Sequence, residues 1–150
     1  MIEIKRILIP TDFSEYSQHS LKYAVALAES FQAKLYVMHV WEHSIIGAPT
    51  EAYPPEIMVG AEQSERETLN RITDELRAKG IDAEPVFVVG RAYVEIVSRA
   101  KQLDVDLITL ATHGRKGLSH LVFGSTAEKI VRLAPCPVLT VKHPEHEFVK

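Results

Sequence analysis

Residues Asp106–Gly124 read DLITLATHGRKGLSHLVFG, an apolar run that leads into a loop containing three glycines. The run Asp106–Thr112 predicts a strand buried on both faces, because its apolar residues are nearly continuous. Ser125 followed by Glu128 is a capping-box pattern, which predicts that a helix begins directly after the loop. A buried strand, a glycine loop and a helix in succession are typical of α/β folds with a parallel sheet.

The same alternation of apolar runs and helix-period segments extends along the rest of the chain. Four further apolar runs predict strands at Arg6–Pro10, Lys34–Val40, Pro85–Val89 and Pro137–Val141. Apolar residues at helical spacing predict helices at Ser17–Phe31, Glu62–Lys79, Ala92–Leu103 and Thr126–Ala134. The pattern also predicts a long loop at Trp41–Met58, a solvated helix face on Glu62–Lys79 and a solvated tail at His143–Lys150. We therefore expect one α/β domain over residues 1–150, with three layers and a five-stranded parallel sheet covered by helices.

Composition restricts the class of protein and its partners. The chain has 150 residues and a net charge of −3, so non-specific binding to nucleic acid or to an anionic membrane is not favoured. No apolar run approaches the roughly 20 residues that span a bilayer. The N-terminal residues lack the pattern of a signal peptide, and Cys136 is the only cysteine. A cytoplasmic location is the expectation.

The loop from His113 to Gly124 has the features of a phosphate site. Gly114 and Gly117 lack a Cβ, so backbone amides there can approach an anion closely, and two basic residues lie between these glycines. The helix N-terminus expected at Gly124 adds free amides and a favourable dipole. The alternative is a plain loop whose glycines serve only turns. The G-x-x-x-x-G-K-[ST] and G-x-G-x-x-G motifs are both absent.

Other candidate residues remain open to more than one interpretation. Asp12 follows the first predicted strand and is a helix cap, a Mg²⁺ contact or a nucleotide contact. His113 either touches phosphate or is a surface histidine without a role. Trp41 and Tyr53 are candidates for stacking on a base, although local packing explains Trp41 equally simply. Cys136 lies between two prolines and predicts a small buried apolar residue rather than a reactive thiol.

At these residues the chain resembles the universal stress protein family, and the resemblance covers nearly all of it. Arg6–Ser14 (RILIPTDFS) is similar to that family's first strand and turn, and Asp106–Arg115 (DLITLATHGR) is similar to its fourth strand and loop. Gly124 with Ser125, and the stretch Ala134–Leu139 (APCPVL), resemble its last helix and strand.

The nucleotide-binding branch of the family carries glycine, two residues, glycine, nine residues, then glycine and Ser or Thr. Here the second glycine matches Gly114, and nine residues separate it from Gly124 and Ser125. The position of the first glycine holds Ala111. Its methyl group would crowd the site if the backbone there required a positive φ, which strand ends seldom do.

The resemblance also implies which residues contact a nucleotide. Asp12 would reach the ribose side, and Val40 would meet the adenine through its backbone. Residues expected to line the pocket are Pro10, Thr11, Leu110 and Ala111. Residues expected to hold the phosphates are Gly114, Arg115, Gly124, Ser125 and Thr126. The implied cofactor is ATP, ADP or AMP, with Mg²⁺ accompanying the nucleotide.

The family fold implies the strand order 3-2-1-4-5 and a homodimer in which the last strands, Pro137–Val141, pair. We therefore expect a homodimeric regulatory protein that binds adenine nucleotides, acts in the stress response and has a protein partner that the sequence does not name. Two alternatives stay open: an interaction protein of the same fold that binds no nucleotide, and a slow ATPase. The sequence shows no catalytic set of side chains.

Overall fold

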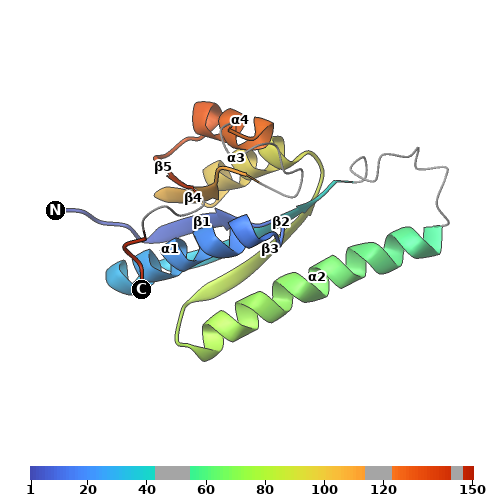
Figure 1. The fold of residues 1–150 in the computed structure, drawn as a ribbon, viewed down its shortest axis with the longest axis horizontal. Coiled ribbons are helices and arrows are strands. Elements are labelled where there is room, and N and C mark those ends of the chain that lie inside the picture. The colour runs from blue at the N-terminus through green and yellow to red at the C-terminus, as the bar shows by residue number, and fades with distance from the viewer. Residues whose placement is uncertain (43–54, 114–122, 143–146) are drawn as a thin grey trace.

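The computed structural model describes residues 1–42, 55–113, 123–142 and 147–150. Its strands are β1 (Arg6–Pro10), β2 (Lys34–Trp41), β3 (Ala83–Val89), β4 (Leu107–Ala111) and β5 (Val138–Val141). Its helices are α1 (Glu15–Phe31), α2 (Pro55–Ala78), α3 (Ala92–Gln102) and α4 (Ser125–Leu133). Strands and helices alternate along the chain as the periodicity predicts (Figure 1).

The five strands form one sheet in the order β3-β2-β1-β4-β5, and every neighbouring pair is parallel. The α/β class and the strand order implied by the family resemblance are thereby confirmed. The chain moves from β1 outward to β3 on one side and then crosses to β4 on the other. This reversal puts the carboxyl ends of β1 and β4 side by side, where parallel sheets bind ligands.

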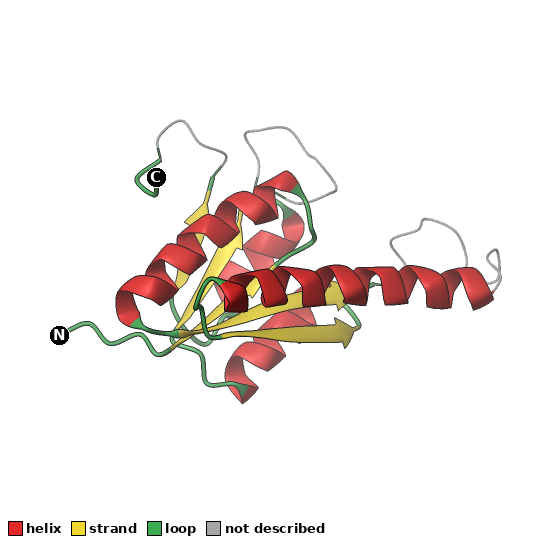
Figure 2. Ribbon diagram, turned by 90° about the horizontal axis from the view of Figure 1, so that it is seen from below, coloured by secondary structure: helices red, strands yellow, loops and turns green. Residues whose placement is uncertain are grey.

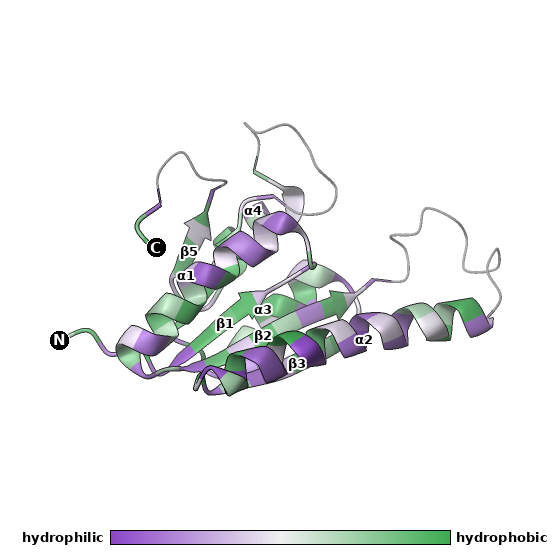
Figure 3. Cartoon of the chain, turned by 60° about the horizontal axis from the view of Figure 1, so that its bottom comes forward, coloured by the Kyte–Doolittle hydropathy of each residue, from purple (hydrophilic) through white to green (hydrophobic). Residues whose placement is uncertain are grey.

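Helices cover both faces of the sheet (Figure 2). On one face, Ala24 and Ala28 of α1 and Leu69 of α2 pack on Ile7 and Ile9 of β1. On the other face, side chains of α3 and α4 pack on the intervening residue Leu8, which is fully buried. Successive strand residues thus face opposite layers, which explains why the strands read as continuous apolar runs. Figure 3 shows this hydrophobic colouring along β1 and β2.

The region after β2 differs from the prediction of a loop over Trp41–Met58. Trp41 belongs to β2 and is buried, and α2 begins at Pro55 rather than at Glu62. Proline at the first position of a helix lacks only an amide that would be unpaired there anyway, so Pro55 starts the helix instead of preventing it. The first turns of α2 extend beyond the sheet and expose Ile57 and Val59 (Figures 1 and 2).

The predicted solvated tail contacts α1 at two residues, although Phe148 is 72% exposed, as predicted, and only Glu147 of the two is partly buried. The Glu147 carboxylate lies 3.5 Å from His19 Nδ1 and 3.6 Å from Lys22 Nζ, both on α1. The Phe148 ring meets Tyr23 edge to face, with ring centroids 4.9 Å apart. Residues 143–146 lie outside the described part of the chain. In the described ranges, no helix is both long and apolar enough to cross a membrane.

Candidate functional site

A pocket of about 270 Å³ opens where the carboxyl ends of β1 and β4 meet. Nine residues expected to contact a nucleotide line it: Pro10, Thr11, Asp12, Val40, Leu110, Ala111, Gly124, Ser125 and Thr126. Gly114 and Arg115, the other two, lie outside the described residues. The fold therefore gathers into one cavity side chains that come from positions more than 100 residues apart.

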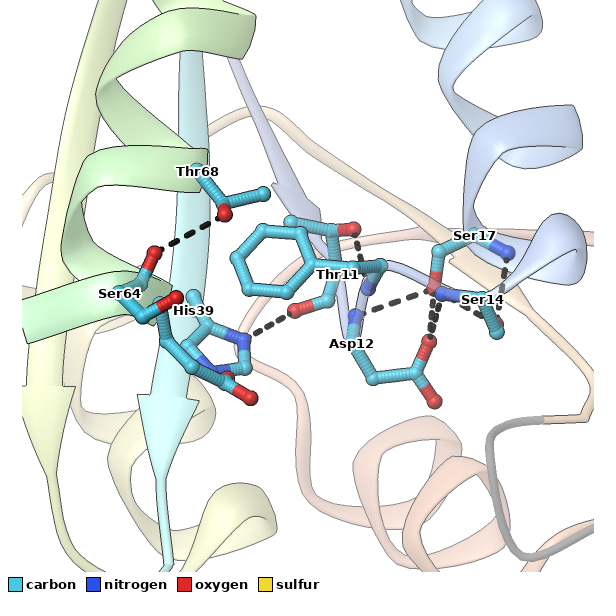
Figure 4. A network of polar contacts seen from close by, with 9 residues as sticks. Thr11, Asp12, Ser14, Ser17, His39, Ser64 and Thr68 are labelled. Carbon is cyan, nitrogen blue, oxygen red and sulfur yellow. Dashed lines mark hydrogen bonds and ion pairs between the residues drawn. The ribbon is translucent and has the colours of Figure 1, made fainter. Parts of the chain in front are cut away.

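The turn after β1 is held by its own side chains (Figure 4). Asp12 Oδ1 accepts hydrogen bonds from the Ser14 amide at 3.0 Å and from the Ser17 hydroxyl at 2.6 Å. Ser14 is the N-cap of α1, and its hydroxyl accepts from the Ser17 amide. The cap of α1 is therefore Ser14, and Asp12 supports it from the preceding turn while also lining the pocket; its contact with nucleotide or Mg²⁺ stays a prediction.

Phe13 lies in the left-handed region, with φ of 65°, which a bulky residue adopts only where its surroundings impose it. The Thr11 hydroxyl accepts from the Phe13 amide at 3.1 Å, and the Phe13 ring stacks on His39 with centroids 4.3 Å apart. The conformation turns the chain sharply from β1 into α1 and keeps Asp12 at the pocket. No pattern in the sequence indicated this strained residue.

His39 connects the turn after β1 to helix α2. Its Nδ1 lies 2.7 Å from the Thr11 carbonyl oxygen, and its Nε2 lies 2.5 Å from Glu65 Oε2. A carbonyl oxygen only accepts hydrogen bonds, so Nδ1 is the donor in its contact with Thr11 and Nε2 is the ring nitrogen that faces the carboxylate. The side chain of His39 is 5% exposed and that of Glu65 is 19% exposed. The prediction that the charges of α2 are a solvated face is therefore wrong at Glu65, which faces inward and pairs.

The N-termini of α3 and α4 border the pocket, and they differ in which groups accept hydrogen bonds from their first backbone amides. At α3, Glu42 Oε1 accepts a short hydrogen bond from the Ala92 amide, while the cap residue Arg91 supplies no side-chain bond. At α4, the cap residue is Gly124, and no side chain of the described residues caps the helix. Glu42, Ser125 and Thr126 all line the pocket. Among the described residues, a carboxylate therefore accepts from an amide at the start of α3, whereas the acidic residue in the first turn of α4, Glu128, pairs with Arg132 instead.

The capping box predicted for Ser125 and Glu128 is not formed. The Gly124 amide donates to the Thr112 carbonyl at 2.9 Å, and α4 begins at the next residue, so Ser125 is inside the helix. The Glu128 carboxylate lies 3.0 Å from the Arg132 guanidinium instead. Within the described ranges, the first amides of α4 therefore have no side-chain cap, and a helix start of this kind favours an anion.

The end of β4 has an ordinary extended backbone. Ala111 pairs in register with Val141 of β5 and is buried, and it is not among the described residues with positive φ. Its methyl group therefore causes no backbone strain. His113 also lines the pocket, with Nδ1 3.0 Å from the Thr112 hydroxyl and its ring tilted on Tyr16 at 5.5 Å.

The sequence pattern did not assign a role at this site to four residues: Ser17, His39, Glu42 and Glu65. Each is a common polar residue that belongs to no recognisable motif. The hydrogen-bond or ion-pair partner of each lies either on another helix or strand or in the adjacent turn. A buried histidine in an apolar strand was the one available signal, since such a ring requires partners. Cys136, predicted to be buried, is only half-buried, and burial raises the pKa of its thiol, so the thiol stays protonated at neutral pH.

Metal-ligating side chains do not gather in the described ranges, where no group of three His, Cys, Asp or Glu residues could hold an ion. Trp41 is buried and does not line the pocket, so it does not stack on a base there. Tyr53 lies outside the described residues.

Comparison with known proteins identifies relatives along nearly the whole chain. The model of the Universal stress protein family matches residues 3–142. Universal stress protein MJ0531 of Methanocaldococcus jannaschii is 33% identical over 144 residues, which are 95% of this chain and 85% of the relative. The solved structure of MJ0577, from the same organism, is 29% identical with a TM-score of 0.83, covering 97% of this chain and all of that one.

Two more distant solved structures contain adenine nucleotides. One is a universal stress protein in complex with cAMP, 20% identical with a TM-score of 0.71. The other is the universal stress protein from Archaeoglobus fulgidus in complex with dAMP, 22% identical with a TM-score of 0.65. Each covers 95% of this chain and all of the neighbour. At these identities the similarity shows a shared fold.

Proposed function

This chain belongs to the universal stress protein family, and from that premise we propose that its pocket binds an adenine nucleotide. The observation that carries the proposal is the start of α4, which borders the pocket and where no side chain among the described residues caps the helix. Amides in this state and the helix dipole favour phosphate oxygens. Val40 and Leu110 add apolar wall to the same pocket, which suits a base.

ATP is the proposed ligand, with ADP and AMP as the alternatives and Mg²⁺ as a companion of the phosphates. The complexes of two neighbours with cAMP and dAMP are consistent with an adenine nucleotide on this fold. Titration calorimetry with ATP, ADP and AMP, each with and without Mg²⁺, tests the proposal. We expect saturable binding of at least one of them. Absence of binding at millimolar nucleotide would overturn the proposal and favour an interaction protein that binds none.

Gly124→Val tests where the phosphates bind. A Cβ at Gly124 would lie 3.3 Å from the Thr112 carbonyl oxygen, and a branched side chain would also cover the approach to the α4 amides. We expect nucleotide binding to be lost. Gly60→Val is the matched control, because a Cβ at Gly60 meets nothing within 4 Å. Equal affinity in both variants would mean that the phosphates bind elsewhere, and circular dichroism checks that each variant folds.

Hydrolysis is proposed only as a slow side activity. Asp12 lies in the turn after β1 and lines the pocket. Its carboxylate already accepts two hydrogen bonds that support the start of α1. Turnover well above a slow background, lost in Asp12→Ala but not in Ser14→Ala, would instead identify an enzyme. The second variant is the control, since it removes a hydroxyl from the same turn without removing the carboxylate.

A homodimer that pairs the β5 edges is the second part of the proposal. β3 and β5 are the two edges of the sheet. The Asp82 carbonyl accepts a hydrogen bond from the Leu35 amide of β2, so the residues that alternate with Asp82 along β3, Pro85 among them, direct their backbone groups to the outer edge. Proline lacks the amide that another strand would need there. On β5 the carbonyls of Pro137 and Val141 face β4, which directs the backbone amides of Val138 and Thr140 to the free edge.

Thr140→Pro tests this edge, because it removes one outward amide while the bonds to β4 are retained. We expect sedimentation analysis to give a dimer for the native chain and a monomer for this variant. A native monomer at micromolar concentration would overturn the proposed dimer. The stress role and the cytoplasmic location are proposed on family membership, and loss of stress tolerance in a deletion strain, restored by the native gene, tests the former.

A further inference from the structure

Glu42 is a charged residue of the pocket to which neither the family resemblance nor the sequence pattern assigned a role. It follows β2 directly, two residues after Val40, and lines the pocket. Its Oε1 is held by the Ala92 amide at the start of α3. The other oxygen, Oε2, has no hydrogen-bond partner among the described residues. One carboxylate oxygen is therefore fixed by the fold, and the second is available to a ligand.

The starts of α3 and α4 differ in how well they would accept a phosphate, and this difference orients a nucleotide in the pocket. Glu42 neutralises the N-terminus of α3 and would repel a phosphate placed beside it. At the N-terminus of α4 the cap residue Gly124 supplies no side chain, and the acidic residue of the first turn, Glu128, pairs with Arg132. On the premise of the proposed nucleotide site, phosphates belong at α4 and the base belongs between Val40 and Glu42.

We propose that Glu42 selects the base by accepting a hydrogen bond from an amino group, and so favours a 6-aminopurine over a 6-oxopurine. A carboxylate only accepts hydrogen bonds, so the exocyclic amine of adenine complements Oε2. The oxygen of a 6-oxopurine would face that carboxylate, two acceptors would then oppose each other, and the contact would be unfavourable. This role extends the proposed function and depends on it.

The test compares AMP with inosine monophosphate, which differ at position 6 but carry the same phosphate. For the native chain we expect calorimetry to give about tenfold or greater preference for AMP, as for a hydrogen bond to a charged group. In Glu42→Gln, the amide oxygen must accept from Ala92, so the NH₂ group faces the ligand. The preference for AMP should then fall by about tenfold or reverse.

Glu84→Gln is the matched control, because Glu84 pairs with Lys34 at the surface and does not line the pocket. Its ratio of AMP to inosine monophosphate affinity should equal that of the native chain. A native chain that binds both nucleotides equally, or an unchanged ratio in Glu42→Gln, would overturn the role of Glu42 while nucleotide binding stands. Binding of neither nucleotide would overturn the proposed function itself. The native measurement decides even if Glu42→Gln does not fold.

Discussion

The two walls of the pocket differ in how their polar groups are satisfied. On the wall formed by β1 and β2, the polar side chains bond to one another or to nearby backbone groups: Thr11, Asp12, Ser14, Ser17 and His39 (Figure 4). On the wall formed by β4 and α4, Gly124, Ser125 and Thr126 lie at helix amides that no side chain in the described part of the chain caps. Both walls are made from the same kind of unit, a strand followed by a helix.

The two walls therefore have different roles in one cavity: one is preorganised, and the other offers hydrogen-bond donors to a ligand. The wall of β1 and β2 is rigid before any ligand arrives, because its turn and its histidine are fixed by internal bonds. The wall of β4 and α4 keeps unfilled hydrogen-bonding capacity, which a ligand can satisfy without displacing a protein group. A binding site needs both properties, since preorganisation lowers the entropy lost on binding and unfilled donors supply the attraction.

The largest expected effect comes from removing the contact between His39 and Glu65 of α2. Glu65→Ala leaves a buried imidazole facing no carboxylate, so we expect the free energy of unfolding to fall by about 3 kcal/mol. Urea denaturation measures this. Glu62→Ala is the control on the same helix, because Glu62 pairs with Arg66 in a surface i,i+4 arrangement and should cost at most about 0.5 kcal/mol. Similar losses in the two variants would contradict a rigid wall.

A pair of serine variants tests the two helix starts directly. Ser14→Ala removes the N-cap of α1 and should lower the free energy of unfolding by about 1 kcal/mol. Ser125→Ala removes a hydroxyl that caps nothing and should change stability by less than about 0.5 kcal/mol. Thermal unfolding of both variants checks the difference. If Ser125→Ala were the more destabilising, α4 would have a cap that its geometry lacks.

The smallest effect is expected from Ala111→Gly, which restores the family's first glycine. Ala111 has ordinary strand geometry, so its methyl group causes no strain, and affinity for ATP should change by less than about threefold. Calorimetry on the native chain and the variant measures the ratio. A much tighter complex in the variant would show that the methyl group crowds the ligand.

The strands and helices were predictable because each depends on local periodicity. Most boundaries moved by only one or two residues, and the exception was α2, where Pro54 and Pro55 suggested a loop but Pro55 begins the helix. The resemblance to a family then supplied the strand order, and the nine described site residues lie in one pocket as it implied. Their contact with nucleotide stays a prediction.

The contacts that define the site chemistry were not predictable in the same way. His39 and Glu65 are 26 positions apart and meet only because α2 lies along the sheet beside β2. Glu42 reaches Ala92 across 50 positions. Ser125 and Glu128 match the sequence pattern of a capping box. The Gly124 amide bonds to the Thr112 carbonyl, however, and α4 begins at Ser125, one residue before the predicted start.

By itself the sequence determined which segments are strands and helices, since side-chain periodicity decides which face of each element is buried. It also placed glycine and serine at the start of α4. Only the tertiary structure decided which helix start is neutralised and which stays open. That choice depends on how the ends of β2 and β4 align with α3 and α4, and a hydrogen bond tolerates only a few tenths of an ångström of misalignment.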